Sequence, residues 1–248
     1  MPLRAVLFDY GHTLVDFHRT EEALLEAYRH VRELVVAAVD EEAAGRVPDA
    51  GRLVRLVTTA VDGIVEASYA ERRLEELDLL GVYEEVLGGL GLTLPPEVIH
   101  RVVTLDHLAF RSCIILPTET REVLGELRGR GLAIGFVSNA HFLPDLLRED
   151  LDLLGLAELI DAGAFSSELG TRKPDSRIFH HVLGELGVAA GDAVHIGDRV
   201  RDDIGGARSA GLAGGILTHQ WRQEQPDGRE LALIRRLGDL PAILDRLT

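Results

Sequence analysis

The chain alternates between short apolar runs and longer stretches in which apolar residues recur with a helical period. Short apolar runs that end at turn residues are typical of strands buried on both faces of a parallel sheet. Their alternation with amphipathic helices predicts a doubly wound α/β sheet with right-handed crossovers. The predicted strands are 5–8, 133–137, 162–165, 193–196 and 214–217, and the helices of this part are 119–130, 144–154, 176–186, 204–210 and 239–247.

The segment after the first strand shows no strand pattern. Thr20 is a suitable N-cap, and residues 21–39 place their apolar side chains on one helical face. Further helices are predicted at 53–68, 70–79, 83–87 and 97–111. We therefore expect an α/β core of residues 1–15 and 118–248, an inserted all-helical cap domain of residues 16–117, and hinges near 15–19 and 116–118.

Composition narrows the possible partners. Hydrophobic residues make up 46% of the 248 residues, which allows a substantial core, and 41 acidic against 26 basic residues give a net charge of −15. Such a charge disfavours nucleic acids and anionic membranes. The single cysteine, Cys113, excludes an intrachain disulfide, and the run at 5–8 is too short for a signal peptide or a membrane span. We expect a cytoplasmic protein; the sequence carries no signal for its oligomeric state.

Two polar clusters directly follow predicted strands. The first strand runs into Asp9, and carboxylates can act as covalent nucleophiles, although an aspartate here can also simply cap a turn. The strand 133–137 is followed by Ser138 and Asn139, which can hydrogen bond to an oxyanion or, alternatively, begin a helix. Because active sites of such sheets lie beyond the carboxyl ends of the strands, these positions favour a shared site.

Two further clusters lie in the second half of the chain. Lys173 precedes a proline at a helix entrance, so its ammonium can be aimed at a carboxylate and a phosphoryl group, although a solvated lysine is the alternative. Asp198 follows another predicted strand, with Asp203 five residues later. Such carboxylates suit Mg²⁺, and without a cation they would repel each other. For Trp221 and Arg222, after the last predicted strand, surface packing is favoured over a role in the site.

The order of these clusters is more informative than each cluster alone. An aspartate loop, a helical insert, a strand that ends in serine, Lys-Pro-Asp, and Gly-Asp with a trailing aspartate together resemble the haloacid dehalogenase superfamily. The resemblance is to members with a helical cap after the first strand. It spans residues 5–217, and its most specific part is the sequence GDRVRDDIGGARSAGL.

The resemblance implies a magnesium-dependent phosphatase that acts on a small phosphorylated metabolite. Its implied reaction is attack of Asp9 on phosphorus, followed by hydrolysis of the aspartyl-phosphate by water. The matching catalytic positions are Asp9, Ser138 and Lys173, the metal ligands are Asp9, the backbone carbonyl of Gly11, Asp198 and Asp203, and the expected substrate-side residues are Thr13, which shapes the loop, and Asn139.

One position departs from the pattern of this superfamily. Its phosphatases usually carry a second aspartate two residues after the nucleophile as acid and base, whereas this chain has Gly11. Such assistance is worth roughly 10²–10⁴ in rate, so its loss should favour substrates with good leaving groups. His12 titrates in the useful range and is the proposed catalytic substitute, with His18, His30 and His107 of the insert as alternatives.

Three other functions compete with this interpretation. A metal-independent 2-haloacid dehalogenase would also use Asp9, but such enzymes lack the Gly-Asp pair present at Gly197 and Asp198. A carbon–phosphorus hydrolase would need a Schiff-base lysine in the cap, and Lys173 is the only lysine of the chain. A low-activity or non-catalytic phosphate sensor is favoured mainly by Gly11.

Overall fold

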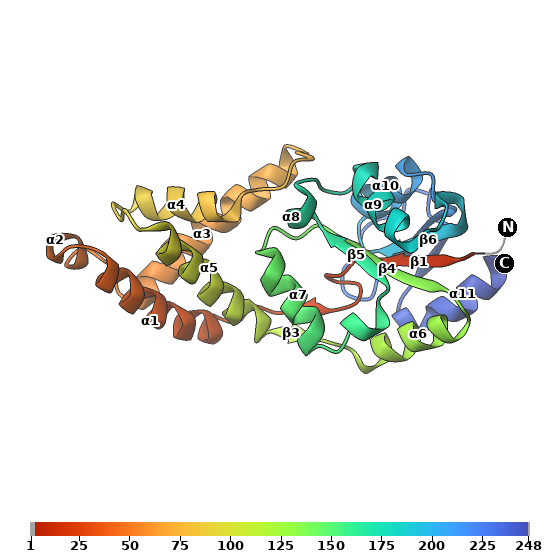
Figure 1. The fold of residues 1–248 in the computed structure, drawn as a ribbon, viewed down its shortest axis with the longest axis horizontal. Helices are drawn as coiled ribbons and strands as arrows, with labels where there is room; N and C mark the ends of the chain where they lie inside the picture. Colours follow the sequence, from red (N-terminus) through yellow and green to blue (C-terminus); the bar gives the residue numbers. More distant parts are fainter. Residues whose placement is uncertain (1–2, 248) are drawn as a thin grey trace.

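The computed structural model describes residues 3–247 and divides into an α/β part and a helical part that lie end to end (Figure 1). The α/β part contains a six-stranded parallel sheet in the order β5-β4-β1-β6-β7-β8. Its strands are β1 (Ala5–Phe8), β4 (Ala133–Ser138), β5 (Ala162–Phe165), β6 (Ala193–Gly197), β7 (Gly214–Thr218) and β8 (Ala232–Ile234). The first five agree with the predicted strands.

The edge strand β8 is not predicted by the sequence pattern. It has three residues, it is followed by two arginines, and its Leu233 is 40% exposed, so no buried apolar run marks it. Only its parallel pairing with β7, which sets Thr218 against Ile234, gives it a strand conformation. Long-range pairing therefore decides the structure of this segment.

Successive strand residues pack against helices on opposite faces of the sheet. On β1, Val6 and Phe8 belong to a core cluster with α6, α7 and α11, whereas Ala5 and Leu7 pack with α9 and α10. Burial on both faces explains why the strands are apolar throughout and confirms the predicted α/β fold class. These helices are α6 (Thr118–Gly129), α7 (Pro144–Leu153), α9 (Ser176–Leu186), α10 (Gly205–Ser209) and α11 (Leu240–Leu247).

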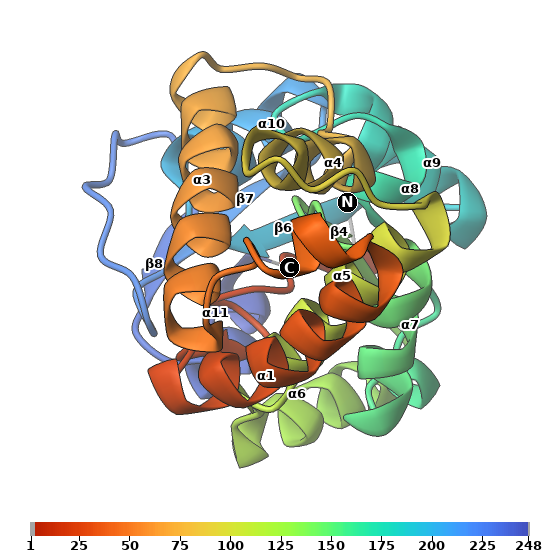
Figure 2. The same cartoon turned by 90° about the vertical axis from the view of Figure 1, so that its left-hand side faces the viewer.

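The helical part has a hydrophobic core of its own. Tyr28 of α1, Leu53 of α3 and Val102 of α5 are fully buried in one cluster. Thr20 caps α1 as predicted, since its side chain accepts a hydrogen bond from the Ala23 N–H. Figure 2 shows α1, α3, α4 and α5 in front of the sheet. The helices are α1 (Glu21–Ala38), α2 (Glu41–Ala44), α3 (Ala50–Ala70), α4 (Leu79–Gly89) and α5 (Pro96–Arg111).

The predicted helix at 70–79 is wrong, because a loop separates α3 from α4 there. In this loop Arg72 has a positive φ of 56°, which a right-handed helix cannot accommodate. Glu75 pairs with Thr171 of the α/β part in an isolated antiparallel bridge. The local pattern favours a helix, but contacts with a distant loop fix an extended conformation.

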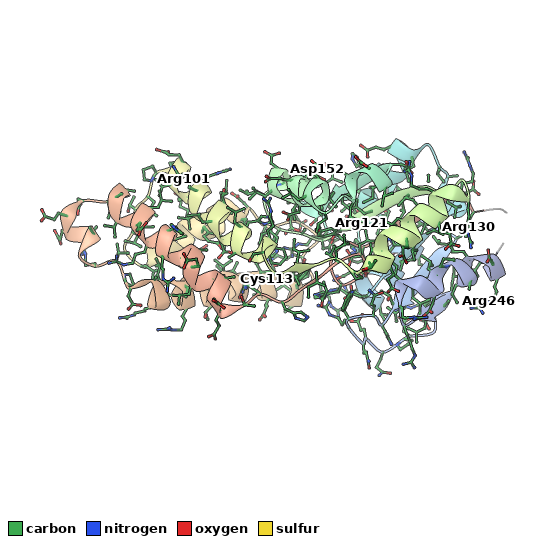
Figure 3. The ribbon with its side chains drawn as sticks, turned by 90° about the horizontal axis from the view of Figure 1, so that it is seen from below. Arg101, Cys113, Arg121, Arg130, Asp152 and Arg246 are labelled. Atoms are coloured by element: carbon green, nitrogen blue, oxygen red, sulfur yellow. The ribbon has the colours of Figure 1, made fainter. Side chains whose placement is uncertain are left out.

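Two short strands connect the two parts of the molecule. β2 (Asp16–Phe17) and β3 (Ile114–Ile115) pair antiparallel, close to the predicted hinges. Seen from below, Arg101 lies on the helical part and Arg246 near the far end of the α/β part (Figure 3). Within residues 3–247, none of the helices combines the length and the apolar character that a bilayer crossing requires.

Candidate active site

The carboxyl ends of the parallel strands bring the predicted site residues together. Asp9 follows β1, Ser138 ends β4 and Asp198 follows β6, so all three reach the same edge of the sheet. They line one cavity of about 370 Å³ together with Lys173, which lies in the loop before α9. Carboxylate oxygens of Asp9, Asp198 and Asp203 lie within 4.8 Å of one another. The structure therefore assembles these five residues at one site.

Lys173 is buried between two of these carboxylates. Its Nζ lies 2.8 Å from Oδ1 of Asp9 and 2.6 Å from Oδ1 of Asp203. Burial alone would lower the pKa of Lys173, but the charges of Asp203 and Asp9 outweigh it and raise that pKa above its usual range. The Asn139 side chain accepts a hydrogen bond from the Lys173 N–H (2.7 Å) and donates one to its carbonyl (3.1 Å). Asn139 thus fixes the lysine backbone as well as lining the cavity.

Asp203 is fully buried, and its carboxylate accepts hydrogen bonds from three donors. Besides Lys173, it accepts hydrogen bonds from Nε2 of His195 (2.8 Å) and from the backbone N–H of Arg199 (2.9 Å). Burial alone would raise the pKa of Asp203. Lys173 and His195 outweigh this effect, so that pKa lies well below its usual range. A Cβ at Gly197 would lie 2.1 Å from the Asp203 carboxyl carbon, so only glycine fits there. This contact explains why glycine precedes Asp198 in the motif.

The charge of the Asp198 carboxylate is only partly neutralised by its neighbours. Burial, together with Asp9 and Asp203, raises its pKa to about 8. Its Oδ2 is buried and accepts no aligned hydrogen bond within the described chain, although Nη1 of Arg222 lies 3.0 Å away. This oxygen still lacks an aligned donor in residues 3–247, although Lys173 and Arg222 are nearby cations, and an unsatisfied buried oxygen among three carboxylates fits a hard divalent cation such as Mg²⁺. The residues present are therefore suitable ligands for the implied metal.

Arg222 lies in the site rather than in plain surface packing. The sequence favours surface packing for it and for Trp221, whereas the structure places Arg222 in the cavity wall and against Asp198. The sequence does contain one indication of this role. The loop that carries Arg222 follows the carboxyl end of β7, on the same edge of the sheet as Asp198.

The space beside Gly11 is filled by an aromatic ring. A Cβ at Gly11 would lie 3.0 and 3.1 Å from two ring atoms of Phe17, closer than normal packing allows. An aspartate at this position would require the Phe17 ring to shift by a few tenths of an ångström. Both residues line the cavity, so the place of the missing carboxyl group is apolar.

His12 lines the cavity, whereas the histidines of the insert do not. Its Nδ1 lies 2.7 Å from Oδ1 of Asp16, and its backbone has a positive φ of 57°. Burial lowers the pKa of His12, and the hydrogen bond to Asp16 opposes this shift. Of the alternatives, His18 and His30 are exposed, and His107 is buried against another carboxylate. Geometry therefore favours His12 among the predicted histidines.

Thr13 does not reach the cavity. It is fully buried, it is absent from the cavity wall, and its hydroxyl has no hydrogen-bond partner in residues 3–247. This placement suits the loop-shaping role expected for Thr13 rather than a contact with a bound molecule.

Other residues of the cavity wall were not among the predicted site residues. The helical part and the hinge contribute Phe17, Arg19, Asp62, Tyr69 and Phe110, and the α/β part adds His141, Phe142, Leu147, Arg199 and Asp202. No local pattern distinguishes the residues of the helical part from ordinary packing positions, whereas the residues of the α/β part lie in or near loops at the carboxyl ends of β4 and β6. The helical part thus covers the carboxyl edge of the sheet.

A buried arginine joins the helical part to the loop of Lys173. Arg172 is fully buried; its Nε donates to Oε1 of Glu76 (2.8 Å) and its Nη1 donates to Oγ of Ser68 (2.8 Å). Its guanidinium carbon lies 4.3 Å from the centre of the Tyr69 ring. The residue directly before the buried lysine is therefore held by the helical part.

Comparisons with known proteins agree with this geometry. Residues 3–211 match a family of hydrolases described as haloacid dehalogenase-like hydrolase. A phosphoserine phosphatase from Thermus thermophilus is 38% identical over 122 residues, which are 49% of this chain and 47% of that protein. A glyceraldehyde 3-phosphate phosphatase from Methanopyrus kandleri is 26% identical over 211 residues, 85% of this chain and 82% of that protein.

A similar solved structure is that of a 2-haloacid dehalogenase from Pseudomonas syringae, with a TM-score of 0.68 and 22% identity over 99% of this chain and 100% of that one. At this identity the similarity concerns the fold alone. The match to the Thermus protein spans about half of that relative's length.

Proposed function

Because the chain belongs to the haloacid dehalogenase-like hydrolase family, we propose that it is a magnesium-dependent phosphatase of a small phosphorylated metabolite. The two relatives described above are phosphatases. The observation that carries the proposal is the buried cluster of Asp9, Asp198 and Asp203 around Lys173. Three carboxylates and a phosphoryl group carry more negative charge than Lys173 and Arg222 together neutralise.

Asp9 is the proposed nucleophile. One of its oxygens forms a bond to phosphorus while the bond from phosphorus to the ester oxygen breaks. Lys173 holds Asp9 in place and neutralises negative charge that develops on the phosphoryl oxygens, and the Ser138 hydroxyl binds one of these oxygens. When bound, Mg²⁺ supplies further charge neutralisation; its proposed ligands are Asp9, the carbonyl of Gly11 and Asp198, with Asp203 as support through water.

His12 is the proposed proton carrier for the second step, in which water hydrolyses the aspartyl-phosphate. Asp16 accepts a hydrogen bond from Nδ1–H, which leaves Nε2 as the free acceptor of the neutral ring. Such a ring can take a proton from water. We expect His12→Gln to slow this step selectively, so that the phosphorylated enzyme accumulates; equal slowing of both steps would contradict the assignment.

Residues 16–117 are the proposed cap domain. They include α1–α5, contribute side chains to the cavity wall and join the core through β2 and β3. In that position the cap would exclude water during the reaction and choose the substrate.

A direct test measures phosphate release with Mg²⁺ from acetyl phosphate, sugar phosphates and nucleotides. Asp9→Asn should abolish release. Asp245→Asn is the matched control, because that aspartate is 66% exposed and belongs to α11. Release that survives in the Asp9→Asn protein would refute the proposed nucleophile.

Two other functions remain testable with the same protein. A 2-haloacid dehalogenase, the activity named for the Pseudomonas structure, would release halide from 2-chloropropionate in the presence of a chelator. A phosphate sensor would trap beryllofluoride on Asp9 and yet turn over no phosphate ester. The acidic cluster around Asp198 favours the metal-dependent phosphatase over the metal-independent dehalogenase, and turnover of a phosphate ester separates the phosphatase from the sensor.

A further inference from the structure

A continuous row of five rings lines one wall of the cavity. His12 and Phe17 have ring centres 4.5 Å apart, Phe17 and Phe110 4.8 Å, Phe110 and Phe142 4.7 Å, and Phe142 and His141 4.6 Å. All five residues line the same cavity as Asp9 and Lys173. The row begins at His12, in the loop of the nucleophile, and ends at His141, in the loop after β4.

Three separate parts of the chain build this row. Phe17 lies in the hinge strand β2, Phe110 in the helix α5, and Phe142 in the loop after β4. Local sequence neighbours cannot produce such an arrangement. Phe110 is 7% exposed, and it contacts both of the other phenylalanines. An apolar wall of ring faces and edges favours a flat apolar group in the bound molecule.

The absence of a carboxyl group at Gly11 restricts the leaving group of the substrate. Residue 11 is glycine and the Phe17 ring lies beside it, so this position supplies no carboxylic acid to protonate the departing oxygen. An aliphatic alkoxide has a conjugate acid with a pKa close to that of water, about 16. A phenol has a pKa of about 10 and leaves as the phenolate without a proton donor.

We propose that the substrate is a phosphate monoester of an aromatic hydroxyl group. This inference rests on the proposed phosphatase function and narrows its substrate class. The aryl ring packs against the row around Phe110, with its phosphoryl group at Asp9. An Asp9 oxygen bonds to phosphorus, the bond to the aryl oxygen breaks, and the phenolate leaves with the electron pair and takes a proton from solvent. Water then cleaves the aspartyl-phosphate into inorganic phosphate and the free carboxylate.

Three small substrates separate ring binding from leaving-group chemistry. Phenyl phosphate has both a flat ring and a good leaving group, benzyl phosphate has the ring with an aliphatic leaving oxygen, and cyclohexyl phosphate has neither. Measured as kcat/KM, benzyl phosphate should exceed cyclohexyl phosphate by about two- to tenfold through ring packing. Phenyl phosphate should exceed benzyl phosphate by about 10² or more, because it needs no acid.

A variant of the row gives the second arm of the experiment. Phe110→Leu should lower the benzyl-to-cyclohexyl ratio of kcat/KM to about one. Leu108→Ala is the matched control, because that residue lies on the same helix, is 40% exposed and is absent from the cavity wall; it should leave the ratio unchanged.

Different results overturn different claims. Equal kcat/KM for benzyl and cyclohexyl phosphate, or for phenyl and benzyl phosphate, would overturn the aryl inference. If acetyl phosphate is still hydrolysed in an Asp9-dependent way, the phosphatase function survives that result. Absence of Asp9-dependent hydrolysis of acetyl phosphate and of all three esters would instead refute the proposed function.

Discussion

Replacing Glu76 by alanine should loosen the connection between the helical part and the loop of Lys173. Glu76 and Arg172 form an ion pair in which both side chains are at most 2% exposed. The backbone reinforces it, since Arg172 N–H donates to the carbonyl of Leu74 (2.7 Å) and Glu76 N–H to that of Gly170 (3.1 Å). The substitution removes the charge partner and leaves the backbone contacts in place.

The expected loss of stability follows from burial. Removing one partner of a buried ion pair costs about 3–5 kcal/mol, because the remaining charge stays desolvated. Arg172 keeps its contacts with Ser68 and Tyr69, so we expect a value near the lower limit, about 3 kcal/mol. For a chain of this size that corresponds to a decrease in Tm of about 6–12 °C.

Urea unfolding can measure this loss with two probes. Circular dichroism reports on all helices, and the single tryptophan, Trp221, reports on the α/β part. The control is Glu26→Ala, because Glu26 pairs with Arg29 on the surface, where both side chains are about 60% exposed. Such an exposed pair contributes at most about 1 kcal/mol.

A double variant distinguishes loss of charge from loss of packing. Combining Arg172→Met with Glu76→Leu removes both charges, so it should recover most of the stability that Glu76→Ala loses. If Glu76→Ala were no more destabilising than Glu26→Ala, the buried pair would not hold the two parts together and the reasoning from burial would be refuted.

Three further results are expected. Mg²⁺ at about 100 times its Kd should stabilise the protein by about 2.7 kcal/mol, and Asp198→Asn should remove this gain in thermal unfolding; an equal gain in the variant would contradict the metal site. Burial lowers the pKa of His141 to about 4, below its unfolded value of 6.5. The contribution of His141 to stability is therefore present above pH 6.5 and is lost as the pH falls toward 4. His141→Gln should show a smaller decrease in Tm over this range than the unaltered protein, and an identical decrease would refute the assignment. Gly163→Ala should cost about 1–3 kcal/mol in urea unfolding, because its Cβ would lie 2.1 Å from the Phe136 ring, whereas Gly125→Ala, in open space on α6, should cost nothing.

The core strands and the polar residues at their ends could be predicted from the sequence. Buried parallel strands are apolar throughout, so each one is visible locally, and their carboxyl ends must meet at one edge of the sheet. This rule is sufficient to bring Asp9, Ser138 and Asp198 together, as the structure does. The position of Lys173 was also informative, because the proline that follows it restricts the lysine backbone and so fixes where its side chain begins.

Which further residues surround the site could be decided only by the tertiary structure. The loop at 71–78 has a helical pattern, but pairing with a distant loop imposes an extended conformation. Phe110 and Phe142 have ordinary packing positions in the sequence and meet only because α5 lies against the loop after β4. Arg222 follows the predicted strand β7, but only the path of the loop in three dimensions brings its side chain to Asp198. Side chains that act through contacts between distant segments leave no periodic signal, whereas residues at strand ends inherit their position from the sheet itself.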